Sequence, residues 1–124
     1  MSHTIPLHFE HQRRQSPGEA EAARAWAEPG RIRLRAGLSL GSPGWQIKAT
    51  AWRRRRHITL SVCAVQTGVP AAAADEMEDV GYAAVLEGLK PGRYQVQVSH
   101  LFKLRDTSHP VLTTSPYHFV VEVP

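Results

Sequence analysis

Residues 45–65 read WQIKATAWRRRRHITLSVCAV, and apolar and polar side chains alternate on both sides of four consecutive arginines. Alternation with a period of two is typical of a β-strand that has one buried face. If residues 53–56 form a loop closed by Trp52 and His57, Ala51 lies opposite Ile58 and the other apolar residues share that face. A shift of one residue in this pairing would place apolar and polar side chains together on both faces. The stretch therefore predicts a β-hairpin with the arginines at its tip.

The arginine tip is an unusual turn. Adjacent arginines repel one another, and Gly, Asn or Asp would form a tight turn more easily. This mismatch is the one sign in the sequence that the charge serves some purpose beyond forming the turn. The candidate partner-binding residues are the tip and its two neighbours, namely Trp52, Arg53, Arg54, Arg55, Arg56 and His57. The alternative interpretation is a solvated tip whose charge prevents aggregation between strands.

The segments around the hairpin continue the alternating pattern. Residues 31–38 set Ile32 and Leu34 against three arginines, and residues 94–100 and 117–123 also alternate. GSPG at 41–44 and KPGR at 90–93 have the composition of turns, and Gly92 would take the positive-φ position of a type II turn. About seven short strands separated by turns predict an all-β sandwich of the immunoglobulin-like kind.

The N-terminal 30 residues are predicted to be a lead-in to a sandwich domain that spans residues 31–124. Residues 4–10 alternate and contain Pro6, which favours a strand at a sheet edge. Ser16, Pro17 and Glu19 then form a helix-start pattern, several alanines favour helix, and Pro29-Gly30 would end it. We expect a short N-terminal helix here, or else a disordered lead-in.

The segment LKPGRYQVQV at residues 89–98 carries a resemblance to a known class of domain. It resembles the turn and penultimate strand of fibronectin type III and immunoglobulin-like modules, among them small bacterial β-sandwich domains. The resemblance implies a tyrosine corner, in which the Tyr94 hydroxyl bonds back to the preceding turn. It also implies an immunoglobulin-like sandwich, but it says almost nothing about function.

Composition and charge narrow the class of protein. The chain has 124 residues, which suits one domain, and its one cysteine, Cys63, excludes an internal disulfide. No apolar run approaches the roughly 20 residues that span a membrane, and no signal-peptide core is visible, so the cytoplasm is the expected compartment. Residues 31–60 carry eight cations and no acid, whereas residues 61–90 carry one lysine and five acids. Attraction between these two segments, within one chain or between copies, is one consequence of that polarity.

The sequence shows no pattern of catalytic or metal-binding groups. The seven histidines lack the spacing of a zinc site, and no G-x-S-x-G or phosphate-binding loop occurs. On the predicted strand Cys63 and His57 are roughly 20 Å apart at about 3.3 Å per residue, so they cannot act together. We therefore expect no catalytic residue, no metal and no cofactor.

These observations predict a non-enzymatic interaction module that binds a protein partner or associates with copies of itself. The arginine tip would make the first contact with an acidic partner. The alternative is a module that binds nucleic acid or another polyanion through Arg53, Arg54, Arg55 and Arg56 together with Trp52.

Overall fold

The computed structural model describes residues 2–14, 23–40, 45–66, 78–104 and 112–124. These ranges contain nine β-strands and no helix. The strands are β1 (His3–Thr4), β2 (Leu7–Arg14), β3 (Arg24–Glu28), β4 (Arg31–Leu40), β5 (Trp45–Arg54), β6 (His57–Gln66), β7 (Glu78–Leu86), β8 (Gly92–Lys103) and β9 (Leu112–Val123). None of the described residues forms a helix long and apolar enough to cross a membrane.

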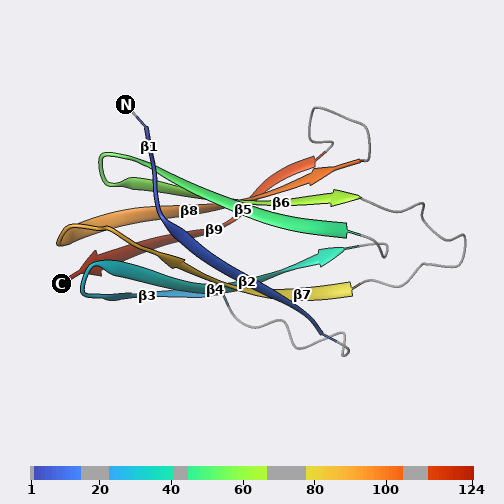
Figure 1. The fold of residues 1–124 in the computed structure, drawn as a ribbon, viewed down its shortest axis with the longest axis horizontal. Coiled ribbons are helices and arrows are strands. Elements are labelled where there is room, and N and C mark those ends of the chain that lie inside the picture. The colour runs from blue at the N-terminus through green and yellow to red at the C-terminus, as the bar shows by residue number, and fades with distance from the viewer. Residues whose placement is uncertain (1, 15–22, 41–44, 67–77, 105–111) are drawn as a thin grey trace, which may run out of the picture.

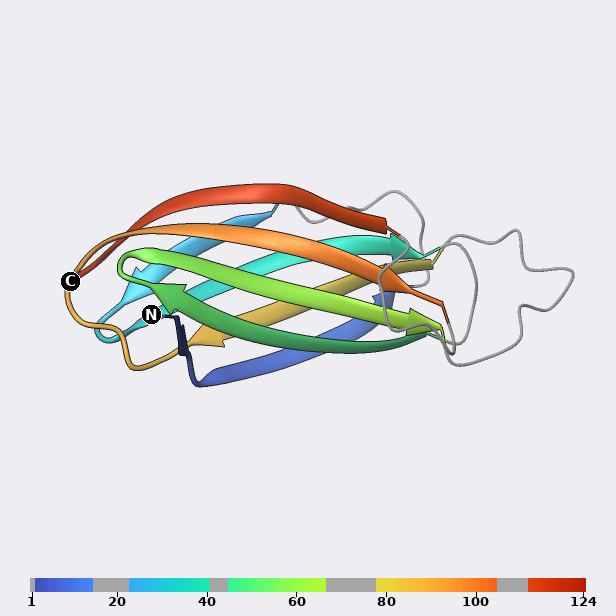
Figure 2. The same ribbon diagram turned by 90° about the horizontal axis from the view of Figure 1, so that it is seen from above.

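The strands form two sheets that lie face to face (Figures 1 and 2). One sheet has five strands in the order β1-β5-β6-β8-β9, and the other has four in the order β2-β7-β4-β3. Neighbouring strands are antiparallel except β6 and β8, which run parallel. Alternate residues of each central strand are buried between the sheets, as in β4, where Ile32, Leu34 and Ala36 are fully buried. The predicted all-β, two-sheet architecture is confirmed.

The β5–β6 hairpin is present, but its turn is tighter than the sequence predicts. Arg54 pairs with His57, so only Arg55 and Arg56 remain in the turn, and Trp52 pairs with Thr59 rather than with His57. The predicted four-residue loop is therefore wrong by two residues in register. Because a shift of two keeps every side chain on its face, the predicted buried face is right. That face is formed by Ile47, Ala51, Ile58, Leu60, Val62 and Ala64.

The predicted N-terminal helix is wrong where the structure describes it. Residues 24–28 form β3, which pairs antiparallel with β4 across a turn in which Gly30 has φ = 77°. Pairing supplies backbone hydrogen bonds and lets Ala25 and Ala27 pack against the core, and such tertiary gains override a weak local helix propensity. The start pattern at Ser16, Pro17 and Glu19 lies outside the described residues.

The predicted N-terminal edge strand is divided between the two sheets. β1 pairs with β5 in the five-stranded sheet, and β2 pairs with β7 in the four-stranded sheet. The crossing falls at Ile5 and Pro6, where the Ile5 amide donates to the Ala51 carbonyl at 2.9 Å and the Pro6 carbonyl accepts from the Glu87 amide at 3.0 Å. Both β1 and β2 are edge strands, the position that Pro6 predicts.

The segment before β8 differs in detail from a type II turn. Gly92 has a positive φ, as predicted, but its value of 147° is far from the roughly 80° of a type II turn. The chain bends at Pro91 and enters β8 directly at Gly92. The Tyr94 hydroxyl donates to the Lys90 carbonyl at 2.8 Å, which is the hydrogen bond that the resemblance implies.

Candidate functional site: a basic end of the sandwich

Two basic segments that are distant in the sequence meet at one end of the molecule. The β5–β6 turn lies beside the segment that joins β7 to β8, at the end where the C-terminus also lies (Figures 1 and 2). The Gln95 amide donates to the Arg56 carbonyl at 2.9 Å, and His57 is opposite Gln95 at the start of the parallel β6–β8 pair. We call this surface the basic end; it comprises Arg53, Arg54, Arg55, Arg56, Lys90 and Arg93.

Arg56 is the member of the basic end that holds the turn in place. Its guanidinium lies 5.5 Å from the centroid of the Tyr94 ring, and its Nη1 donates to the Pro91 carbonyl at 3.4 Å. Gly92 makes this approach possible, since a Cβ at that position would overlap the guanidinium. A cation over an aromatic face contributes roughly 0.5–1 kcal/mol at exposed sites. Arg56 is thus an anchor rather than a free ligand-binding group.

The other arginines of the tip differ in exposure. Arg54 and Arg55 are exposed, and neither has an ion-pair partner within the described ranges. Arg53 is half-buried and lies opposite His3 of β1. Trp52 is 37% exposed and points to the outer face of the five-stranded sheet, between Thr4 and Thr59 in register. Among the arginines of the tip, Arg54 and Arg55 are therefore the most available to a partner.

Part of the acidic segment, residues 61–90, lies at the end of the sandwich opposite the basic end. Glu78 and Asp79 open β7 opposite Leu40 and Ser39, at the other end of the sandwich (Figure 1). Oε1 of Glu87 lies 3.8 Å from Nη1 of Arg31, so this acid already has a cationic neighbour. Asp75 and Glu76 lie outside the described residues.

Arg55 occupies a backbone conformation that suits glycine better than arginine. Its φ of 57° is the only positive value among the described non-glycine residues. A residue with a side chain pays about 1–2 kcal/mol to adopt this conformation, and glycine does not. Glycine also increases the conformational entropy of the unfolded chain, which cancels part of the gain. We expect Arg55→Gly to raise the free energy of unfolding by about 0.5–1 kcal/mol, measured by urea denaturation. Arg54→Gly, on a residue paired within β5, should lower it, and the same sign for both changes would contradict this reading.

A second cluster lies inside the sandwich and joins the two sheets. The Tyr82 hydroxyl of β7 and Nε2 of His100 in β8 share a hydrogen bond of 2.7 Å, and both residues are buried. The Tyr117 ring stands edge-on to His100, and the Tyr117 hydroxyl donates to the Gly37 carbonyl of β4 at 3.0 Å. Desolvation lowers the pKa of His100 to about 4, so the ring is neutral at physiological pH. Desolvation also raises the pKa of Tyr82, and Tyr117 adds to that shift.

This internal cluster was only partly predictable from the sequence. The alternation of residues 94–100 places His100 on the inner face, but no local signal connects it to Tyr82. The three polar rings cross-link opposite sheets by hydrogen bonds, and no buried side-chain nitrogen or oxygen of the described residues lacks a partner. The cluster is closed within the core, so its role is structural.

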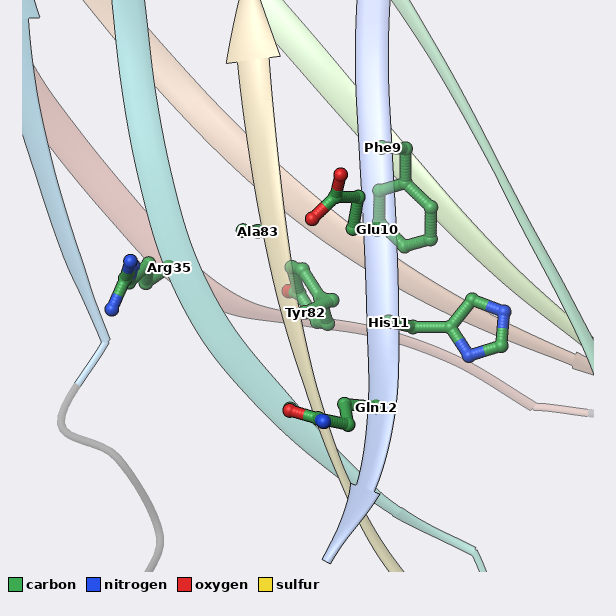
Figure 3. Close-up of a pocket in the computed structure, with 8 residues that line it drawn as sticks. Phe9, Glu10, His11, Gln12, Arg35, Tyr82 and Ala83 are labelled. Atoms are coloured by element: carbon green, nitrogen blue, oxygen red, sulfur yellow. The ribbon is translucent and has the colours of Figure 1, made fainter.

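A shallow hollow of about 620 Å³ lies on the four-stranded sheet (Figure 3). Gly81 and Ala83 of β7 carry little or no side chain, while Glu10 and Gln12 of β2 and Arg35 of β4 project from the strands on either side. Figure 3 shows Arg35 on one side of β7 and the two β2 side chains on the other. The hollow is polar and open, and its chemistry selects no particular ligand.

The described residues gather no metal-binding cluster. Within those ranges, no group of three or more His, Cys, Asp or Glu side chains is placed to hold an ion. Cys63 is half-buried in β6, where it pairs with Lys48 and Leu101, and His57 is at the opposite end of the same strand.

The fold and the site define an all-β, two-sheet protein with a positively charged end. No protein-family model matches the chain, and neither the curated proteins nor the solved structures include a match.

Proposed function

We propose that the protein is a non-enzymatic interaction module that binds an acidic segment of a partner protein through its basic end. The observation that carries the proposal is that two distant segments with six cationic residues lie side by side, with Arg54 and Arg55 exposed and without ion-pair partners in the described chain. Arg56 supports it, because this anchor holds the turn in one place against β8. A positioned set of arginines suits carboxylates, which accept two parallel hydrogen bonds from one guanidinium.

The proposal includes an immunoglobulin-like class for the sandwich. The hydrogen bond from Tyr94 to Lys90 supports it, since a tyrosine at this place is a hallmark of such modules. The parallel β6–β8 pair is a difference from the two antiparallel sheets of those modules. Small sandwiches of this kind commonly bind partners through their loops and strand edges, which is an argument from analogy of fold.

The grouping of exposed arginines at the β5–β6 turn favours a protein over nucleic acid. Arginines on the four-stranded sheet have local partners: Arg33 bonds to Glu28, Arg31 approaches Glu87, and Arg24 lies 5.2 Å from the Trp26 ring centroid. A nucleic-acid binder neutralises several successive phosphates and needs a more extended basic face. One observation favours single-stranded nucleic acid as a second candidate: exposed Trp52 lies on the sheet face next to the arginines, where a base could stack.

The test uses two probes of equal charge, a fluorescent deca-glutamate peptide and a fluorescent single-stranded DNA. Binding is measured by fluorescence anisotropy at low salt and at about 0.15 M salt, where charges are screened beyond roughly 8 Å. We expect the peptide to bind, and Arg54→Ser/Arg55→Ser to weaken it at least about tenfold, since each lost charged hydrogen bond is worth roughly 1.5–3 kcal/mol. Arg56 is left in place because its removal would also disturb the turn.

Arg35→Ser is the matched control, because Arg35 is also exposed and lies on the four-stranded sheet, away from the basic end. The control should bind the peptide as the wild type does. Equal losses in the control and the double variant would show a general charge effect and contradict the proposal. Tighter binding of DNA than of the peptide, lost on Trp52→Ala, would establish the second candidate instead.

A further inference from the structure

Among the described residues, β9 is the outermost strand at one edge of the five-stranded sheet, and this long strand carries little charge. β9 is the last strand of its sheet and runs for 12 residues, and residues 112–121 include no acid, lysine or arginine. Natural proteins usually protect an exposed edge with charges, prolines or a very short strand, because unpaired backbone groups invite another chain. Here Pro116 and Pro124 interrupt the edge, and the segment between them, residues 117–123, pairs with β8 alone among the described strands.

The outward side chains of this segment are complementary to a second copy of themselves. His118, Val120 and Glu122 are exposed, and Val120 keeps 51% of its surface in contact with solvent. If two β9 strands pair antiparallel about a two-fold axis at Val120, Val120 lies opposite the partner's Val120. His118 then lies opposite the partner's Glu122, on both sides of the axis. Pro116 lies opposite the partner's Pro124, so the ladder ends at a proline in both directions.

We propose that two copies of the chain associate by pairing β9 with β9, which joins their five-stranded sheets into one continuous sheet. A symmetric dimer requires the same patch on both copies to be self-complementary, and the order His, Val, Glu at alternate positions meets that requirement. One aliphatic pair and two pairs of a histidine with a glutamate are favourable cross-strand neighbours. β3 of the other sheet lies next to β9, so the approaching copy also meets this strand.

The pairing would also arrange the two basic ends. Arg54, His57, Gln95 and Val120 follow one another across the four strands in a single row. At about 4.8 Å between strands, the seven strand spacings between Arg54 and the partner's Arg54 amount to roughly 34 Å. Dimerisation itself does not depend on the binding of an acidic partner, so it is tested without any ligand.

The first experiment is a cross-link at the proposed axis. Val120→Cys in a Cys63→Ser background places two thiols opposite each other, because directly paired antiparallel residues have Cα atoms about 4.5–5.5 Å apart, within disulfide range. We expect a covalent dimer under mild oxidation. The matched control, His118→Cys in the same background, should not cross-link, since the two cysteines would be four residues, roughly 13 Å, out of register.

The second experiment exchanges charges across the interface, read by sedimentation equilibrium over a range of concentrations. His118→Glu sets two carboxylates opposite each other on both sides of the axis in its own dimer. Glu122→Lys instead removes the carboxylate that faces His118 and sets an ammonium group there. The dimer of each variant alone should have a dissociation constant about tenfold higher than that of the wild type. An equimolar mixture should form a heterodimer of wild-type affinity, because each His118→Glu strand then faces a Glu122→Lys strand. Thermal unfolding of each variant reports whether it is folded.

The outcomes separate this proposal from the proposed function. A monomeric wild type at all concentrations, or equal cross-linking at residues 118 and 120, would overturn β9 pairing. A dimer whose dissociation constant is unchanged in both variants would have its interface elsewhere, which would also overturn β9 pairing. If a β9 variant that stays monomeric still binds the deca-glutamate peptide, the proposed function of the basic end holds without dimerisation.

Discussion

Replacing Tyr94 with alanine is expected to lower the free energy of unfolding by about 4 kcal/mol. Tyr94 is 2% exposed and lies at the start of β8, and truncation of a buried aromatic ring costs roughly 3–5 kcal/mol. The change also removes the hydrogen bond to the Lys90 carbonyl and the ring under the Arg56 guanidinium. The loss should appear as a lower midpoint of urea denaturation, with a similar slope if the unfolded state is unchanged.

Tyr94→Phe separates the hydrogen bond from the ring. It keeps the packing and the aromatic face but leaves the Lys90 carbonyl without this donor, so we expect a loss of about 1 kcal/mol. The alanine variant should in addition weaken peptide binding at the basic end, because Arg56 loses its support, whereas the phenylalanine variant should not. Equal stability losses for the two changes would mean that the hydroxyl, not the ring, dominates at this position.

The alternation of apolar residues accounts for how much of the fold could be predicted. In a strand the side-chain period is two, so residues such as Leu34 in β4 and Leu60 in β6 reveal their buried face directly. The same property hides register errors of two residues, which is why the hairpin was predicted with Trp52 opposite His57. Sequence rules favour Gly or Asn at a positive φ, and Arg55 breaks that rule, so the two-residue turn could not be recognised.

Long-range pairing accounts for what the sequence did not predict. Residues 24–28 are rich in helix-forming alanine, yet their pairing with β4 makes them a strand. Pairing of β6 with β8 is a contact between segments separated by a whole strand of the other sheet, and it carries no local signal. That contact brings Lys90 and Arg93 to the arginine tip. The tip itself was predictable as a candidate, whereas the size of the basic end and the anchoring role of Arg56 were not.

Acidification is expected to destabilise the protein through His100. The pKa of this buried imidazole is about 4, well below the ordinary 6.5 that it regains on unfolding. Between these values the unfolded chain binds a proton that the folded chain excludes, so stability is complete above pH 6.5 and falls as the pH drops toward 4. A difference of about 2.5 pKa units corresponds to roughly 3 kcal/mol of lost stability at pH 4. Urea denaturation at a series of pH values between 7 and 4 measures it.

The contribution of His100 is isolated by comparison with His100→Gln. Glutamine can still hydrogen-bond the Tyr82 hydroxyl between the sheets but does not titrate. The other titratable groups are the same in both proteins, so their effect cancels in the difference. The variant should have a lower free energy of unfolding than the wild type at pH 7, because the packing beside Tyr117 is lost. From pH 7 to pH 4 the wild type should lose about 3 kcal/mol more than the variant, so the difference between them narrows or changes sign. Parallel curves for the two proteins would mean that protons reach His100 without opening the sandwich, and that the Tyr82–His100 pair is not sealed in the core.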